Sequence, residues 1–237
     1  LGVTGLLRTM GLQDRQEPVT IYGPRPTRII DDLVRVGIER NKFPVEVVQV
    51  SPGERLARKD YDIAVFETDH RTDTVGYALV EHIRLGRFNP ERARELGIPE
   101  GPLWGRIHRG ESITLPDGRT LTNEEIVGPP RPGRTLVYPG DTRPTPSVIL
   151  AAHGADLLVH EATFAEEERD RAEETGHSTA RQAAEVARMA RVRQLALTHI
   201  SARYSREAPE LLDEARAVFP DTVIARDGLT IEVPFPL

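Results

Sequence analysis

The segments DLLVHEAT (156–163) and QLALTHIS (194–201) are short apolar runs with the composition of buried strands. Between them, Thr179 to Gln182 has the capping-box pattern that opens a helix, and the apolar residues that follow fall on one helical face. A third apolar run, RTLVYPGD (134–141), precedes both. Strands that alternate with helices in this way predict a layered α/β domain.

Further elements are predicted on either side of this region. The predicted helices are 28–39 and 208–219, and the predicted strands are 45–51, 62–68, 75–81 and two around the Asp-Gly pair in 222–234. Strands and helices are thus expected over most of the chain.

Residues 85–133 have a different character, because they are rich in Gly, Pro and Arg. The only elements predicted there are a short helix at PERAREL (90–96) and a hairpin around LPDGRT (115–120). A segment this long with so little core pattern is usually functional or flexible. We expect it to pack poorly.

Composition limits the chemistry that the chain can perform. The 237 residues carry a formal charge of −6 and include no cysteine, which excludes disulfides and thiolate metal sites. Any metal would be held by histidine and carboxylate groups, a set that favours zinc or manganese. No run approaches the roughly 20 apolar residues of a membrane span. No signal peptide is visible, and a cytoplasmic location is expected.

Three polar residues stand at the ends of predicted strands. His70 closes DIAVFETDH, Asp141 closes TLVYPGD, and His199 closes QLALTH. A single residue of this kind would be read as an ordinary strand-end or turn residue. Three from separate strands favour a shared site, because functional groups gather at the carboxyl ends of strands in α/β folds. Two imidazoles and a carboxylate suit a metal ion, and Gly140 would let the backbone direct Asp141 inward.

Glu161 and His177 form a second candidate pair. Glu161 follows a strand, and His177 lies at the start of a helix, whose positive end favours the neutral imidazole. A nearby carboxylate opposes this effect and favours the protonated ring, which suits proton donation to a leaving group. Without further information, two ordinary surface groups are an equally good reading. His160 is interpreted as structural.

The chain resembles the tRNase Z family in motifs that occur in the same order: GLLRTMGL, YGP, TDH, GPP…G, GDTR, HEATF, HST, LTHIS and LTIEVP. These proteins are zinc endoribonucleases of the metallo-β-lactamase superfamily that mature tRNA 3′ ends. The resemblance runs along essentially the whole chain and implies an αββα sandwich, N-terminally incomplete, with a protruding arm. It implies that 1–84 begins the fold, 85–133 is the arm, and 134–237 is the C-terminal half.

The resemblance also implies roles for individual residues. His70, Asp141 and His199 match zinc ligands, with Asp141 bridging two ions, and Glu161 and His177 match residues that assist protonation of the leaving oxygen. Two zinc ions per subunit, a homodimer and precursor tRNA as substrate are implied as well. The arm would grip the tRNA, with its arginines as candidate contacts. These are Arg87, Arg92, Arg94, Arg106 and Arg109, with Arg84 beside them. Interspersed glutamates leave a solvated, salt-bridged surface as the alternative for this arm.

One departure from the family pattern is large. The family's His-x-His-x-Asp-His motif should precede LGVTGLL and is absent from the sequence. We expect that an upstream segment is missing rather than lost in nature. Two other functions remain open at this point. One is a small-molecule metallo-hydrolase, of lactonase or glyoxalase type, and the other is a catalytically dead tRNA-binding chain.

Overall fold

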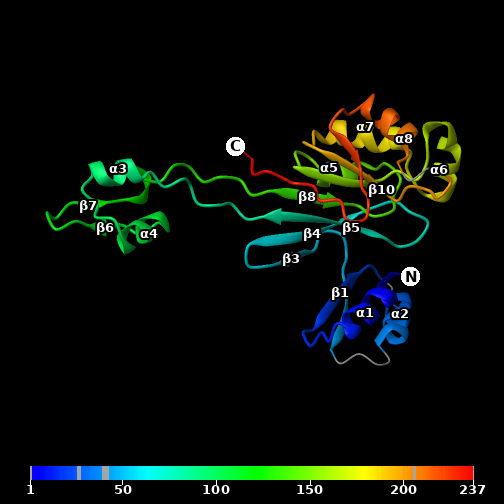
Figure 1. The fold of residues 1–237 in the computed structure, drawn as a ribbon, viewed down its shortest axis with the longest axis horizontal. Helices are drawn as coiled ribbons and strands as arrows, with labels where there is room; N and C mark the ends of the chain where they lie inside the picture. The colour runs from blue at the N-terminus through cyan, green and yellow to red at the C-terminus, as the bar shows by residue number, and fades with distance from the viewer. Residues whose placement is uncertain (1, 26–27, 39–42, 205–206, 237) are drawn as a thin grey trace. The chain divides into compact units, whose positions relative to one another are not determined.

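The computed structural model describes residues 2–25, 28–38, 43–204 and 207–236. The chain divides into two compact units (Figure 1). Unit 1 comprises Leu1–Leu79 and Thr135–Glu232, and unit 2 comprises Val80–Arg134 and Val233–Leu237. Within the described ranges, no helix has both the length and the apolar character needed to cross a membrane.

A seven-stranded sheet with the strand order β11-β10-β9-β8-β5-β4-β3 forms the centre of the fold. The strands are β3 (Arg55–Ala57), β4 (Tyr61–Glu67), β5 (Val75–Glu81), β8 (Thr135–Tyr138), β9 (Leu157–Glu161), β10 (Leu195–Thr198) and β11 (Thr222–Ile224). Strands β8 to β11 are parallel, and Thr198 of β10 pairs with Glu161 of β9. Their carboxyl ends therefore meet at one edge of the sheet.

Helices α5 (Pro146–Ala151), α7 (Ala180–Ala190) and α8 (Pro209–Arg216) lie on one face of this sheet (Figure 1). Helix α7 buries its alanine-rich face, as the spacing predicts, because small side chains let the helix approach the strands closely. Helix α6 (Arg169–Thr175), a 3₁₀ turn at Glu166–Glu168 and helix α5 were not predicted. Each is seven residues or shorter, too short for a periodic pattern to develop.

The predicted capping box of α7 is present. The Thr179 hydroxyl accepts from the Gln182 backbone N–H at 3.1 Å, and the Gln182 side chain accepts from the Thr179 N–H at 2.9 Å. The Thr179 hydroxyl also donates to Glu166 at 2.8 Å. The N-cap residue Thr179, two residues after His177, thus fixes the start of α7.

Thr179→Ala is expected to lower the free energy of unfolding by about 1–2 kcal/mol, because the buried N–H of Gln182 loses its acceptor. Chemical denaturation of the variant measures this loss. Thr175→Ala is the matched control, since the Thr175 hydroxyl bonds only carbonyls of its own helix. An equal effect of the two substitutions would contradict the role assigned to the cap.

A smaller layer of unit 1 is built from the N-terminal residues. Strands β1 (Val19–Gly23) and β2 (Val45–Gln49) form a parallel pair, and helices α1 (Gly2–Leu12) and α2 (Arg28–Ile38) pack with them around Leu7, Val34 and Phe43. The predicted helix 28–39 is confirmed over α2, and Glu39 lies outside the described residues. The Tyr77 hydroxyl donates to the Tyr22 carbonyl at 2.9 Å and links β5 to β1.

Unit 2 has a hydrophobic core of its own, so the expectation of poor packing was wrong. Helices α3 (Pro90–Glu95) and α4 (Pro102–His108), the hairpin β6–β7 (Ile113–Thr114, Thr120–Leu121) and a 3₁₀ turn (Asn123–Glu125) surround this core. The buried members are Ala93, Ile98, Ile107, Ile113, Leu115, Leu121 and Ile126. The apolar residues are widely spaced along the chain, and two helices, a hairpin and a 3₁₀ turn bring them together, which explains why no core pattern was seen.

The second closing strand is also absent from the described residues. After β11, residues 225–236 contain turns and extended segments without ladder pairing. Pro234 and Pro236 lack the N–H groups that a ladder requires. The residues from Val233 onward belong to unit 2 instead.

Candidate metal centre and acid–base pair

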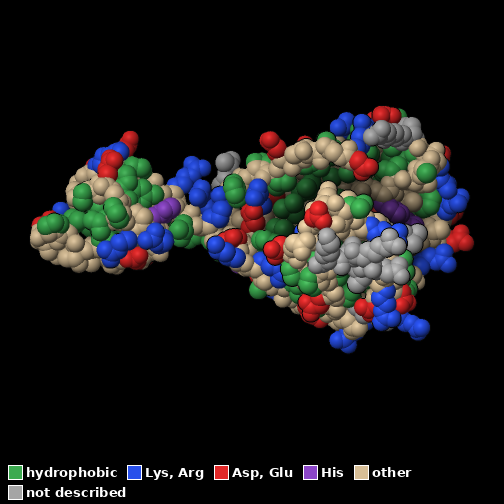
Figure 2. Space-filling view, turned by 60° about the horizontal axis from the view of Figure 1, so that its bottom comes forward, with side chains coloured by type: hydrophobic (Ala, Val, Ile, Leu, Met, Phe, Trp, Pro, Cys, Tyr) green, Lys and Arg blue, Asp and Glu red, His purple; other side chains and the backbone are tan. Residues whose placement is uncertain are grey.

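Five predicted site residues lie at the carboxyl ends of strands or beside them in unit 1. Asp141 follows β8, Glu161 ends β9 and His199 follows β10, three adjacent parallel strands. His70 follows β4, and His177 lies just before α7. Figure 2 shows histidine side chains in a recess of this surface.

The structure brings all five side chains together. His199 Nε2 lies 3.5 Å from Asp141 Oδ2. Among the described residues, the ligand atoms of His70, Asp141 and His177 lie within 4.8 Å of one another, as do those of Glu161, His177 and His199. His70 and His199 share no such group. The His177 ring lies between them, with centroids 4.9 Å from His70 and 5.1 Å from His199.

Hydrogen bonds fix the orientation of the two predicted histidine ligands. His70 Nδ1 donates to the Gly176 carbonyl at 2.7 Å, and His199 Nδ1 donates to Thr163 Oγ1 at 2.8 Å. The proton on Nδ1 leaves a lone pair on each Nε2, the form in which imidazole binds a metal. Each ring is therefore held in the tautomer that a metal ligand requires.

Glu161 connects the candidate ligands to the candidate acid. Its side chain is 1% exposed, and His177 Nδ1 donates to Oε1 at 2.7 Å. Oε1 also accepts from the Thr142 N–H, and Oε2 accepts from the N–H groups of Thr163 and Ser178. The Thr163 hydroxyl donates to Oε2 at 2.9 Å. These donors stabilise a buried carboxylate, which can in turn stabilise an imidazolium on His177.

Unusual backbone conformations shape the same region. His199 has φ +55°, an uncommon value for a residue with a side chain, directly after β10. Gly140 has φ +74° and makes the turn that precedes Asp141, as expected from the sequence. A Cβ on Gly176 would lie 2.9 Å from His70 Nδ1, so only glycine allows the carbonyl of this residue to receive the His70 proton.

The chemistry of these donors suits divalent metal ions, although His70 and His199 do not share one ligand group among the described residues. The donors comprise two oriented imidazoles and a carboxylate, Asp141, whose side chain is 37% exposed and faces one of the rings. His160 is not part of the set. Burial lowers the pKa of His160, and its Nδ1 donates to the Glu161 carbonyl at 2.7 Å, so it is a neutral core residue, in agreement with its interpretation as structural.

Thr163→Val is expected to weaken divalent-metal binding, measured with zinc as the probe, by about 10–100-fold, because the His199 Nδ1–H loses its acceptor and the ring loses its orientation. Titration against a competing chelator measures this effect. Thr114→Val, which removes an exposed hydroxyl in unit 2, is the matched control. Equal zinc affinity in both variants would contradict the orienting role of Thr163.

The predicted arginine contacts lie in unit 2, and most are paired with carboxylates. Arg92 pairs with Glu95 at 2.9 Å and Arg94 with Glu100 at 2.8 Å. Arg106 and Arg109 both reach Glu111, at 2.7 and 3.7 Å. Arg87 makes no ion pair with any residue that the structure describes. The pairs are solvent-exposed and individually weak, so a phosphate can compete for these guanidinium groups.

A groove of about 500 Å³ adjoins the candidate metal centre. It is lined by His70 and Arg71 together with the hydroxyl-bearing residues Ser51, Thr68 and Thr72. The groove provides polar space beside the strand-end residues.

Comparison with known proteins defines the class and then the family. The profile described as "Beta-lactamase superfamily domain" matches residues 120–200. Among solved structures, the metallo-β-lactamase fold protein YhfI of Bacillus subtilis superimposes with a TM-score of 0.60 at 19% identity, covering 96% of this chain and 70% of that one. The short form of human tRNase Z also superimposes with a TM-score of 0.60 at 21% identity, covering 99% of this chain and 74% of that one. The fold is therefore that of the metallo-β-lactamase class.

The curated relatives are more specific. Ribonuclease Z of Gemmatimonas aurantiaca is 58% identical over 236 residues, covering 98% of this chain and 75% of the relative. Ribonuclease Z of Haloferax volcanii is 50% identical over 238 residues, covering 99% of this chain and 75% of the relative. The chain belongs to the ribonuclease Z family.

Sequence reasoning missed the residues that orient the site. Thr163, Thr142 and Ser178 surround Glu161, and Gly176 anchors His70. One usable signal was the position of Thr163, two residues after a glutamate expected at the end of a core strand, because a buried carboxylate requires local donors. The Gly176 contact spans 106 positions and leaves no local signal.

Proposed function

We propose that this protein is a metal-dependent endoribonuclease that removes the 3′ trailer from precursor tRNA and leaves a 3′-hydroxyl on the tRNA. The observation that carries the proposal is the Glu161–His177 pair beside the oriented strand-end donors. Membership of the ribonuclease Z family supports it.

His70, Asp141 and His199 would hold metal, and zinc is the ion we propose, with two ions per subunit. Bound metal would supply activated water and stabilise charge on the phosphate oxygens. His177 would donate its Nε2 proton to the departing 3′ oxygen, while Glu161 holds Nδ1–H and stabilises the charged ring. The buried hydrogen-bond network would keep this acid aligned without rearrangement.

Unit 2 would bind the tRNA through arginine–phosphate contacts that are salt-dependent and largely blind to sequence. A homodimer acting in the cytoplasm is proposed on the family resemblance alone. A small-molecule hydrolase remains the second candidate, supported by the polar groove beside His70.

The test is to incubate the zinc-loaded protein with a precursor tRNA that carries a 3′ trailer and to map the new ends. We expect one cut, a 3′-hydroxyl on the tRNA, a 5′-phosphate on the trailer, and loss of cleavage with a chelator. Intact precursor together with rapid hydrolysis of a lactone or thioester would favour the second candidate.

A further inference from the structure

The last described residues of the chain, 233–236, pack with unit 2 rather than with the sheet that precedes them. The Phe235 ring is in contact with two guanidinium groups. The Cζ of Arg84 lies 3.5 Å from the ring centroid, and the Cζ of Arg134 lies 4.2 Å from it. Arg134 Nη1 also donates to the Val233 carbonyl at 3.2 Å. One aromatic side chain therefore joins two arginines that are 50 positions apart in the sequence.

These two arginines belong to the two segments that connect the core of unit 2 to the rest of the chain. We call residues 80–87 the first leg and residues 128–134 the second leg. The legs pair through backbone hydrogen bonds from Arg84 N to Arg131 O at 2.8 Å and from Arg131 N to Arg84 O at 3.0 Å. Glu81 N donates to Arg134 O at 2.9 Å. A Cβ on Gly133 would lie 2.5 Å from the Glu81 carbonyl oxygen, so the close approach requires glycine there.

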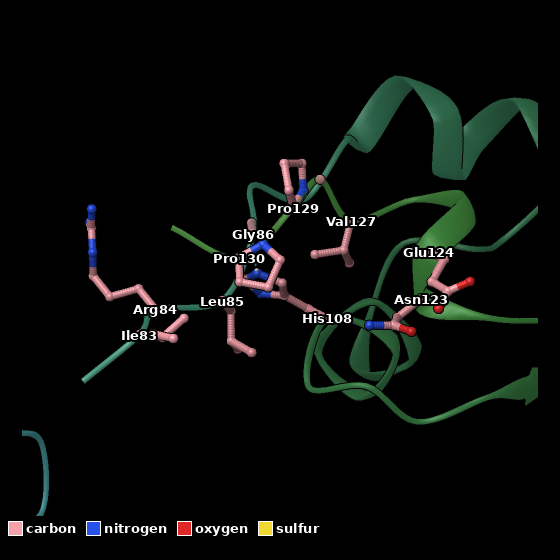
Figure 3. Close-up of a pocket in the computed structure, with 11 residues that line it drawn as sticks. Ile83, Arg84, Leu85, Gly86, His108, Asn123, Glu124, Val127, Pro129 and Pro130 are labelled. Atoms are coloured by element: carbon pink, nitrogen blue, oxygen red, sulfur yellow. Dashed lines mark hydrogen bonds between the residues drawn. The ribbon is translucent and has the colours of Figure 1, made fainter. Parts of the chain in front are cut away.

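The legs have little apolar packing of their own. The buried cluster of unit 2 lies between Ala93 and Ile126, outside both legs. Ile83 is 76% exposed and Leu85 is 50% exposed. Figure 3 shows Leu85 and Pro130, one from each leg, among the residues that line a pocket, which has a volume of about 600 Å³. Two paired segments that bury little apolar surface are marginally stable by themselves, so further contacts are needed to keep the legs paired.

Like charges weaken the pairing of the legs, although the Glu81–Arg134 ion pair joins them. Arg84, Arg131 and Arg134 place three positive groups in this short paired region, which repel one another. Glu81 offsets part of this charge, since hydrogen bonding to Arg134 holds the pKa of Glu81 below its usual value. Arg84 has no carboxylate at salt-bridge distance among the described residues, and its Nε and Nη2 donate to the Pro132 carbonyl. The face of the Phe235 ring attracts both cations.

We infer that Phe235 is a clasp that holds the two legs together and thereby positions unit 2 for its substrate. The clasp is a positioning residue and touches no reacting atom. Its effect on cleavage rests on the proposed function, whereas its effect on the legs does not. The two effects can therefore be measured separately.

The test compares Phe235→Ala with Phe235→Leu, Phe235→Trp and wild type in the full-length protein. Hydrogen exchange is measured at the paired amides of Arg84 and Arg131. We expect exchange in the alanine and leucine variants to be faster by roughly tenfold, because two cation–π contacts are lost. The tryptophan variant should exchange like wild type. The amides of Ile107 and Leu197, one in each unit, serve as internal references and should not change.

Steady-state cleavage of precursor tRNA is measured on the same proteins. The KM should rise several-fold to about tenfold in the alanine and leucine variants with kcat unchanged, and the tryptophan variant should restore it. The rate of bis(p-nitrophenyl) phosphate hydrolysis should be the same in wild type and in all three Phe235 variants. Leu229→Ala is the control for a change near the tail, since Leu229 is 49% exposed in unit 1.

Unchanged exchange at Arg84 and Arg131 in Phe235→Ala would overturn the clasp. Faster exchange with an unchanged KM for precursor tRNA would overturn the positioning role. A wild-type protein that cleaves no precursor tRNA would instead contradict the proposed function, and the exchange result would still decide whether Phe235 holds the legs.

Discussion

His177→Ala should lower kcat for precursor tRNA by about 10²–10⁴-fold while leaving the substrate dissociation constant nearly unchanged. The reason is that the acid role proposed for His177 acts on charge that develops only as the 3′ oxygen departs. Glu161 fixes Nδ1 of this ring at 2.7 Å, which leaves Nε2 as the proton donor. Single-turnover kinetics with a separate binding measurement distinguish the two parameters.

His153→Ala is the matched control, because His153 is an exposed histidine at the end of α5 and outside the site. This variant should retain wild-type turnover. A His177→Ala protein that binds substrate less tightly but turns over normally would show that His177 is a phosphate contact and not an acid. Zinc content must also be compared, since the ring lies between His70 and His199.

Excision of residues 88–127 should raise the dissociation constant for precursor tRNA on the order of 10²-fold at low salt and flatten its salt dependence. The two ends left by the excision already lie close together, because Gly128 N donates to Arg87 O at 2.9 Å. A two-residue turn can therefore join Arg87 to Gly128. The excised segment contains the whole buried cluster of unit 2, so its removal exposes no core elsewhere.

Hydrolysis of bis(p-nitrophenyl) phosphate should survive this excision, because His70, Asp141, Glu161, His177 and His199 all belong to unit 1. Circular dichroism is the control that shows whether the shortened protein folds. Loss of both activities in a folded protein would place part of the catalytic site in residues 88–127. An unchanged tRNA affinity would favour the reading of the paired arginines as a solvated surface.

The C-terminal half was predictable because its signals are local. The capping box at Thr179 and the apolar runs that form β8, β9 and β10 depend on neighbours in the sequence. The positions of Asp141 and His199 at strand ends, together with that of His70 after β4, predicted that the three residues lie at one edge of the sheet. Strand-end positions alone do not show that the His177 ring lies between His70 and His199.

Other features depend on contacts between distant residues. The core of unit 2 requires the hairpin to fold before Ile113 and Leu121 lie side by side. The final strand was predicted from its apolar residues. In the structure, the C-terminal residues instead lie against the legs of unit 2, where the Phe235 ring contacts Arg84 and Arg134. Single-sequence patterns carry no information on such pairings.

The central claim is that the strand-end residues form the metal centre of a phosphodiesterase. Anomalous diffraction at the zinc edge from crystals of the zinc-loaded protein tests it most directly. The account predicts a zinc peak about 2.0–2.2 Å from a carboxylate oxygen of Asp141 and from Nε2 of His70 or His199. It predicts no such peak in Asp141→Ala crystals. Zinc bound elsewhere, or retained at this position without Asp141, would contradict the account.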